Sequence, residues 1–185
     1  MAVTDHDIID CAVRLHEIAP SRIIIGEEIH TTAGEIIGLF LKEYISPKLS
    51  PQDTVDKIKE QGGLVYIPHP FDHLRASVLK RQYLEELADR IDIIEAYNSR
   101  NVFPWSNTKA FDFASKRGKL LGVGSDAHSR FEVGRAYVSI EEFSDANDFL
   151  SKLSDADLHT RKTPAVFNLV NKVYKTFRPK KKGAR

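Results

Sequence analysis

The sequence predicts one α/β domain in which most strands run parallel. Short β-branched runs alternate with helical apolar patterns, and several of these runs end in polar residues that a core cannot use. With 185 residues and 42% hydrophobic content, the chain is long enough to bury one core. We therefore expect residues 1–185 to form a single domain, with a core over about 1–155, a C-terminal helix over 163–177 and a basic tail over 178–185.

A hairpin and a capped helix are predicted first. The runs 22–29 and 34–45 are rich in β-branched residues, and TTAG joins them, which indicates a hairpin. A helix is expected to follow Ser50, whose hydroxyl can cap it, and Gly62 is placed to end it.

The remaining elements alternate in the same way along the chain. Helices are expected over 7–19, 75–90, 107–119 and 145–153. Strands are expected over 64–70, 91–98, 120–128 and 134–140.

The composition and charge of the chain limit the expected cellular location and the expected binding partners. The net charge of +1 does not argue for nucleic acid or membrane, and the basic tail is interpreted as a solvated terminus, with a phosphate-rich partner as the alternative. Cys11 is the only cysteine and follows the apolar pattern of a helix, so we expect a core residue in a reducing, cytoplasmic protein. No apolar run is long enough to span a bilayer, and no signal peptide is evident.

Polar residues gather at the ends of the predicted strands. The carboxyl ends of parallel strands meet on one face of an α/β fold, so residues far apart in the sequence can come together there. Carboxylates mixed with imidazoles suit Zn²⁺, Mn²⁺ or Fe²⁺. The strand-end residues are Asp5, His6, Glu28, His69, Glu95, Asn98, Asp126 and His128.

Each of these residues also has a structural interpretation. Asp5 could cap the helix that begins near residue 7, and Asp126 could cap a turn. His69 could be an ordinary loop residue, and Glu28 could lie at the surface of the hairpin. By the two-residue period of a strand, His30 lies on the same face as Glu28.

Five short motifs resemble those of one known family. TDHD, GEEI, GGLVYIPHP, IIEAYN and GVGSDAHS occur here in the order and with about the spacing of the PHP (polymerase and histidinol phosphatase) family. The resemblance runs from Thr4 to about Ile140 and is closest to small stand-alone phosphoesterase-like members. It implies a distorted (β/α)7 barrel with a cluster of two or three metal ions at its C-terminal face.

The resemblance also implies roles for individual residues. Glu28 would bridge two metal ions, His6 and His128 would share one, and His69 and Asp126 would complete the set. One to three Mn, Zn or Fe ions would activate water for in-line attack on a phosphoester. Glu28, Asp126 and His128 are the expected catalytic residues. The full set of implied metal ligands is Asp5, His6, Glu28, His69, Asp126 and His128, with Asp5 either an extra ligand or a residue that supports one.

The expected substrate is a small phosphorylated metabolite, a nucleotide or an oligonucleotide, which leaves a short nucleic acid open as a partner. Arg75, Arg100 and Arg135 are candidate phosphate clamps, because arginine binds phosphate in a bidentate manner, and Asn98 joins them as a candidate substrate contact. Each of these arginines could equally be a solvated loop residue.

The sequence departs from the family at its start. The family begins with a strand ending in H-x-H, followed by a helix, and this sequence starts at the next strand. We therefore expect a barrel that lacks its first β-α unit, with an edge that could pair in a homo-oligomer. Three functions stay open: a metal-dependent phosphoesterase, a catalytically impaired module with a binding or regulatory role, and an N-terminally truncated form of a longer enzyme.

Overall fold

The helices and strands were located in a computed structural model that describes residues 1–164 and 167. The helices are α1 (Asp10–Ile18), α2 (Pro51–Glu60), α3 (Arg81–Glu86), the 3-10 turn η1 (Ala88–Arg90), α4 (Pro104–Lys116) and α5 (Ala146–Leu153). The strands are β1 (Ala2–Val3), β2 (Ile24–Thr31), β3 (Gly34–Leu39), β4 (Leu64–Ile67), β5 (Ile93–Asn98), β6 (Leu120–Gly124), β7 (Ala136–Ser139) and β8 (Asp157–Thr160). The helix expected over 163–177 and the basic tail fall, apart from residues 163, 164 and 167, outside the described residues.

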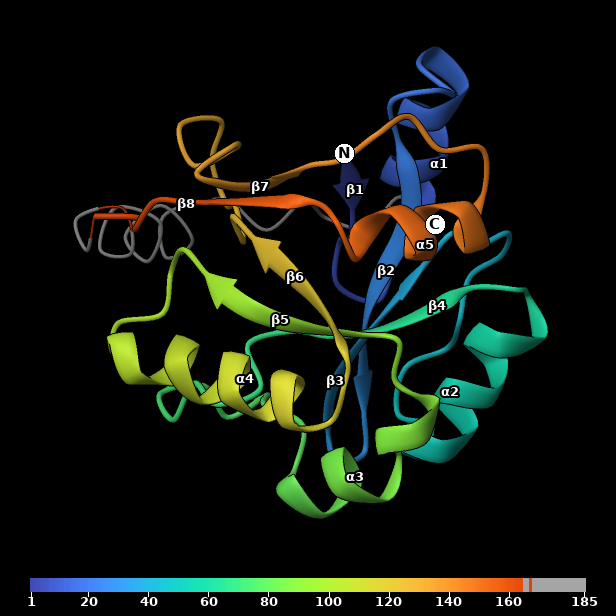
Figure 1. Cartoon of the computed structure of the whole chain (residues 1–185). Coiled ribbons are helices and arrows are strands. Elements are labelled where there is room, and N and C mark those ends of the chain that lie inside the picture. The colour runs from blue at the N-terminus through green and yellow to red at the C-terminus, as the bar shows by residue number, and fades with distance from the viewer. Residues whose placement is uncertain (165–166, 168–185) are drawn as a thin grey trace, which may run out of the picture.

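Strands β1 to β6 form one mixed sheet in chain order. β1–β2, β4–β5 and β5–β6 are parallel pairs, whereas β3 is antiparallel to both of its neighbours. The sheet curls like half a barrel, and β7 and β8 form a separate antiparallel pair beside it (Figure 1). The described residues thus form a mixed α/β fold with a curled, open sheet, and the expected (β/α)7 barrel is not confirmed.

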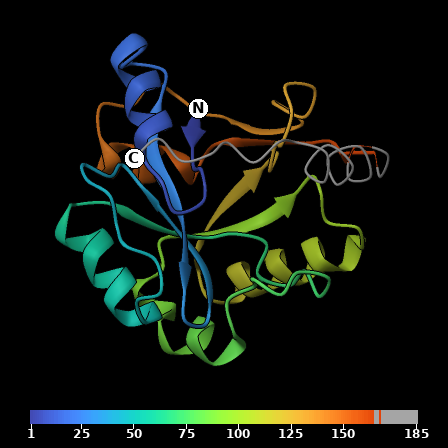
Figure 2. The same cartoon turned by 180° about the vertical axis from the view of Figure 1, so that it is seen from behind.

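The two faces of the sheet are packed by different helices. Neighbouring residues of a strand point to opposite faces, so Ile36 belongs to one core and Ile37 to the other. Helices α2, α3 and α4 cover one face, and α5 covers part of the other (Figures 1 and 2). The face that α5 covers carries Leu39, Leu64, Ile93 and Tyr66, and it continues toward His30 and Glu35.

The predicted hairpin and capped helix are both present. β2 and β3 are joined by the turn at TTAG, and their pairing places Thr31 opposite Gly34. A Cβ added to Gly34, whose φ is 124°, would lie 2.4 Å from Leu79 Cα, so this turn requires glycine. Ser50 Oγ accepts a hydrogen bond of 3.0 Å from Asp53 N, as expected of an N-cap.

Several expectations about local structure were wrong. The strands expected over 34–45 and 120–128 end at Leu39 and Gly124. The helix expected over 75–90 begins only at Arg81, because the backbone before it bonds the hairpin: Glu35 N donates to Ser77 O at 2.8 Å. α4 begins at Pro104 rather than at residue 107, and β8 was not predicted. Cys11 is exposed rather than in the core, since α1 turns Ala12 inward instead.

Among the described residues, no helix is both long and apolar enough to cross a membrane.

Candidate metal centre

Five histidine and glutamate side chains gather where β1, β2, β3 and β4 meet. The hairpin register places His30 directly opposite Glu35, and Glu28 lies on the same face of the sheet. His6 follows β1 and forms an isolated parallel bridge with Glu28. The backbone of His6 is therefore aligned with that of Glu28 on β2. The converging side chains are those of His6, Glu28, His30, Glu35 and His69.

These side chains form two overlapping groups that share Glu35. One group is His6, His30 and Glu35, and the other is Glu28, Glu35 and His69. In the second group His69 Nε2 lies 3.2 Å from Glu28 Oε1 and 3.5 Å from Glu35 Oε2. In the first group His6 Nδ1 lies 3.4 Å from Glu35 Oε1, and two ligands of a tetrahedral zinc ion are separated by about the same distance, roughly 3.4 Å.

The donor set fits a divalent cation. Glu35 is 2% exposed, and its Oε2 atom makes no hydrogen bond to any residue that the structure describes. A buried carboxylate oxygen needs a compensating positive charge or donor. Imidazole and carboxylate together are the ligands that Zn²⁺, Mn²⁺ and Fe²⁺ accept.

Asp7 fixes the orientation of His30. Its Oδ1 accepts from His30 N and its Oδ2 lies 2.9 Å from His30 Nδ1, so His30 Nε2 is directed at Glu35 Oε1, 2.8 Å away. This is the arrangement by which a carboxylate sets the tautomer of a metal-binding histidine. The φ of Asp7 is 53°, a left-handed conformation that is uncommon outside glycine.

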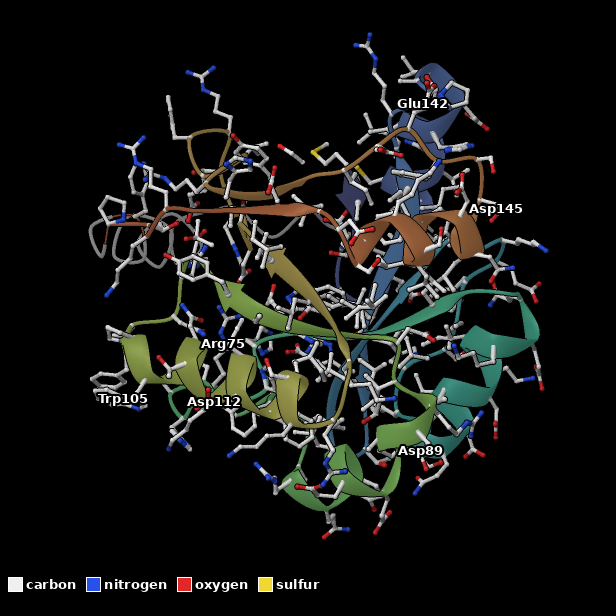
Figure 3. The ribbon with its side chains drawn as sticks, viewed as in Figure 1. Arg75, Asp89, Trp105, Asp112, Glu142 and Asp145 are labelled. Carbon is white, nitrogen blue, oxygen red and sulfur yellow. The ribbon has the colours of Figure 1, made fainter. Side chains whose placement is uncertain are left out.

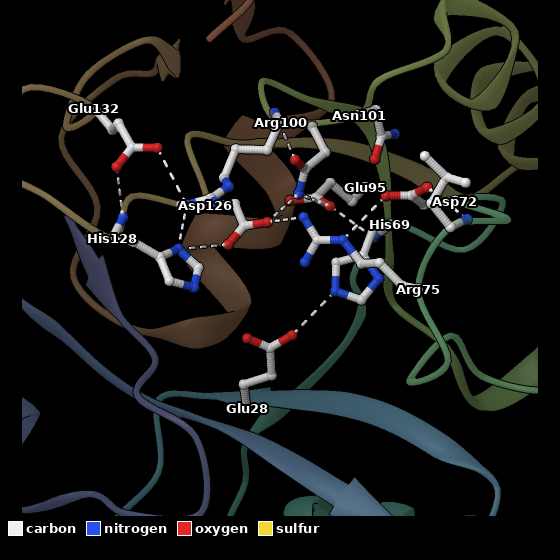
Figure 4. Close-up of polar contacts among 12 residues, drawn as sticks. Glu28, His69, Asp72, Arg75, Glu95, Arg100, Asn101, Asp126, His128 and Glu132 are labelled. Carbon is white, nitrogen blue, oxygen red and sulfur yellow. Dashed lines mark hydrogen bonds and ion pairs between the residues drawn. The ribbon is translucent and has the colours of Figure 1, made fainter. Parts of the chain in front are cut away.

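Asp126 lies beside these groups but in neither of them. Its carboxylate is paired with the guanidinium of Arg75, which also bonds Asp72 Oδ2 at 3.0 Å, and it lies 3.4 Å from His128 Nδ1 (Figure 4). Burial alone would raise the pKa of Asp126, but the charge and hydrogen bond of Arg75 outweigh it and lower that pKa. The backbone turns sharply here, with a φ of 47° at Asp126 and 32° at His69, and such strain often marks functional sites.

The buried carboxylate of Glu95 connects the two regions. It accepts hydrogen bonds from His69 N at 2.6 Å, from Asn98 Nδ2 at 2.9 Å and from the Tyr66 hydroxyl at 3.2 Å. Burial raises the pKa of Glu95. A Cβ on Gly124 would lie 1.9 Å from Glu95 Oε1, so this glycine makes room for the carboxylate.

His69 is almost completely buried between Glu28 and Glu95. Burial on its own would lower the pKa of His69, but the hydrogen bond with Glu28 and the nearby negative charges prevail and raise it. Within residues 1–164 and 167, the Nδ1 atom of His69 has no hydrogen-bond partner. The imidazole therefore sits in a strongly acidic environment, which favours a cation at this point.

An open pocket of about 420 Å³ lies beside Arg75 and Arg100. Arg75, Arg100 and His128 contribute to its wall, and the side chains of the two arginines are mostly buried. Arg75 points inward, whereas the labelled carboxylates on the outer elements lie at the periphery (Figure 3). The apolar and small residues of the wall are Leu74, Ala76, Ser77 and Val102.

Some residues predicted from the sequence are not among the candidate ligands or in the wall of the pocket. Asp5 is exposed and belongs to neither group of candidate ligands. Arg135 does not line the cavity; it donates to Lys162 O at 3.2 Å and lies over the ring of Phe167. Asn98 is buried, and its amide nitrogen donates to Glu95 and to Asp126.

Sequence reasoning missed Glu35 and Asp7, and also Glu132, which forms an ion pair with Arg100 at 3.1 Å. Glu35 opens β3 instead of following a strand, so the rule about strand ends does not single it out. The signal was present in the hairpin: once TTAG is accepted as the turn, the register places Glu35 opposite His30.

Comparisons with known proteins agree with this fold. Residues 104–158 match the family model described as PHP-associated. Two uncharacterized proteins of Methanocaldococcus jannaschii are similar: one is 43% identical over 124 residues, and the other is 42% identical over 101 residues. These matches cover 65% and 53% of this chain, which spans only 52% and 58% of the two relatives.

Three solved structures share the fold at 14–15% sequence identity. A two-domain protein of Bacteroides vulgatus that contains a predicted PHP-like metal-dependent phosphoesterase aligns with a TM-score of 0.61 over 86% of this chain and 55% of its own. A candidate metal-dependent phosphoesterase of Bifidobacterium adolescentis aligns with a TM-score of 0.56 over 90% and 87%. PsfC of Pseudomonas syringae aligns with a TM-score of 0.62 over 95% and 82%.

The motifs, the family-model match and the fold lead to one classification. The fold and the site define a class of protein, namely α/β proteins with a curled sheet that carries a cluster of histidines and carboxylates. Within it, the chain resembles PHP-domain proteins: residues 104–158 match the PHP-associated family model, and the three solved structures share its fold.

Proposed function

We propose that this chain carries the active site of a metal-dependent phosphoesterase that hydrolyses a small phosphorylated metabolite, a nucleotide or an oligonucleotide. The observation that carries the proposal is the sharing of Glu35 by two groups of candidate ligands, with guanidinium groups close by. Paired cation sites next to arginines are an arrangement suited to phosphoryl chemistry.

The ligand groups of this chain would hold up to two cations. Glu28 and His69 would bind on one side of Glu35, and His6 and His30 on the other. Bound metal ions supply an activated water and neutralise phosphate oxygens. Their identity is open among Mn, Zn and Fe.

Arginine side chains would bind the phosphate from the side opposite the candidate metal ligands. Arg75 and Arg100 line the cavity and can donate several hydrogen bonds to phosphate oxygens. Asp126 pairs with Arg75 and lies 3.4 Å from His128 Nδ1, and an imidazole at this place can donate a proton to a leaving oxygen.

Metal analysis and a phosphatase assay test the proposal. Purified protein should retain at least one transition-metal ion and should hydrolyse a phosphate monoester such as p-nitrophenyl phosphate in the presence of Mn²⁺. Glu35→Gln should retain less than about half as much metal and lose the activity, whereas Glu60→Gln on the exposed part of α2 should keep both properties. Protein that binds no metal and hydrolyses neither a mononucleotide nor a short oligonucleotide would contradict the proposal.

A second candidate function is a module that binds a metal or an anion without turnover. The pairing of Asp126 with Arg75, apart from the ligand groups, favours it. In that case Asp126→Ala and His128→Ala would alter stability or anion binding, and no phosphoester would be hydrolysed by any variant. A loss of measurable turnover in these two variants would exclude it.

A further inference from the structure

Glu132 is a buried carboxylate in an exposed loop. It lies between β6 and β7 and is 0% exposed, whereas its neighbours Phe131 and Val133 are 62% and 55% exposed. A short loop that presents two large apolar side chains to solvent and buries its acid reverses the usual preference. This placement requires compensating interactions for the charge.

The two carboxylate oxygens of Glu132 have different partners. Oε1 lies 3.1 Å from Arg100 Nη1. Oε2 accepts from Ser129 Oγ at 2.8 Å and from His128 N at 3.2 Å. One side chain thus connects the β5–α4 loop to the β6–β7 loop at the wall of the cavity (Figure 4).

Among residues 1–164 and 167, the side chain of Arg100 makes hydrogen bonds only through Nη1, so its other N–H groups have no partner in this part of the chain. A guanidinium has five N–H donors in a fixed plane, and Glu132 holds Arg100 through Nη1, which also approaches Asp126 O at 3.5 Å. The side chain of Arg100 is only 12% exposed, so its orientation is set by these contacts. A long arginine side chain held in advance loses less rotamer freedom when an anion binds.

We infer that Glu132 is a positioning residue that orients Arg100, and with it the backbone at His128, for the phosphate group of the substrate. This inference rests on the proposed function, because it assigns Arg100 to phosphate. A carboxylate so close to an anion site would by itself repel the anion. Its positioning effect must therefore exceed that repulsion.

A double-mutant cycle on phosphate binding tests the inference. The dissociation constant of inorganic phosphate is measured by calorimetry on metal-saturated wild type, Glu132→Gln, Arg100→Gln and the double variant. Glu132→Gln keeps an acceptor for the loop but removes the charge that holds Arg100. We expect it to weaken phosphate binding about tenfold, and to change the constant by less than about twofold when Arg100 is already glutamine.

Ser129→Ala is the matched control for the loop. It removes one hydrogen bond from the same carboxylate and leaves the Arg100 pair intact, so phosphate binding should change by less than about twofold. In steady-state kinetics Glu132→Gln should raise KM about tenfold with kcat nearly unchanged, as expected when binding common to ground and transition state is lost. Circular dichroism and thermal unfolding identify a variant that does not fold, and Glu132→Asp then takes its place in the cycle.

Three outcomes overturn the inference. Unchanged phosphate binding in Glu132→Gln, tighter binding through relief of repulsion, or an equal loss in the Arg100→Gln background would each exclude positioning through Arg100. A different result would reject the proposed function alone. If Glu132 and Arg100 are coupled in phosphate binding but no phosphoester is hydrolysed, the role of Glu132 is supported and the phosphoesterase activity is rejected. Absence of phosphate binding by the wild type would reject the inference.

Discussion

Asp7 holds His30 at two points, accepting from its backbone nitrogen and lying 2.9 Å from its ring Nδ1. Asp7 itself is kept in place by a backbone hydrogen bond from Asp7 N to Glu28 O at 3.1 Å. Because Asp7 follows β1 and His30 lies on β2, this contact ties the start of the chain to the hairpin. The orientation of one candidate ligand therefore depends on a segment outside the hairpin.

Asp7→Asn should weaken metal binding without removing it. The amide keeps a hydrogen bond to the backbone of His30 but no longer favours a donor on Nδ1, so Nε2 becomes a poorer ligand. We expect a loss of affinity of about tenfold or more. Calorimetric titration with Zn²⁺ or Mn²⁺ measures it, and Asp10→Asn at the start of α1 serves as the control. Equal affinities for wild type and Asp7→Asn would contradict this role.

Glu35→Gln should affect both groups of candidate ligands at once. Its carboxylate lies within reach of His6, His30 and His69, and an amide is a weaker ligand with no charge. We expect metal content after dialysis to fall to less than about half of the wild-type value. The metal-free variant should be at least as stable as wild type, because one buried charge is gone. A variant that retained full metal content would show that the two groups do not depend on Glu35.

The stability of the metal-free protein should depend on pH through Glu27. This residue is completely buried, and burial raises its pKa from 4.5 to about 7 despite a hydrogen bond from Ile45 N. Between these pH values the folded state binds more protons than the unfolded state, so Glu27 contributes a loss of stability as the pH rises from 4.5 to 7. The loss is at most about 3 kcal/mol.

Urea unfolding of Glu27→Gln in the presence of a chelator measures this contribution. The variant should match wild type near pH 4.5 and exceed it increasingly toward pH 8, because glutamine carries no proton to lose. Exposed Glu43 gives the control Glu43→Gln, which should follow wild type throughout. A difference between Glu27→Gln and wild type that stays constant with pH would refute the assignment.

Arg75→Met should destabilise the protein through Asp126. The substitution leaves a carboxylate whose side chain is only 14% exposed without its guanidinium partner, so the pKa of Asp126 should rise and the free energy of unfolding should fall by about 2 kcal/mol. Adding Asp126→Ala should recover part of that loss, since the unpaired charge is removed. Denaturant unfolding at pH 7 measures both effects.

Arg90→Met supplies the comparison for that cycle. Arg90 pairs with Asp56 at the surface, where both side chains are well exposed, and the change should cost less than about 1 kcal/mol. If Arg75→Met is no more costly than Arg90→Met, the Arg75 pair does not stabilise the fold.

Much of the architecture could be predicted from local patterns. The hairpin, the Ser50 cap and the alternation of strands and helices depend on residues close in sequence, and these predictions agree with the structure. The helix expected over 75–90 failed because the backbone near Ser77 bonds the hairpin, a long-range contact that no local pattern contains. The curl of the sheet likewise depends on packing between elements far apart in the sequence.

The candidate site was predictable where it follows parallel strands. His6, Glu28 and His69 were found in this way, and the structure brings them together. Asp126 and His128 were expected among the metal ligands, but left-handed backbone at Asp126 accompanies its pairing with Arg75 instead. Glu35 was missed because it enters from the antiparallel strand of the hairpin.

The hairpin has a consequence for assembly of the centre. Glu28, His30 and Glu35 lie within eight consecutive positions, and their register depends only on β2 pairing with β3. Hairpins form on a microsecond scale, about 1–10 μs, well before distant strands pair. A chain still folding would thus already hold two candidate ligands of each group, His30 with Glu35 and Glu28 with Glu35, and metal bound there would stabilise the hairpin register before His6 and His69 pack against it.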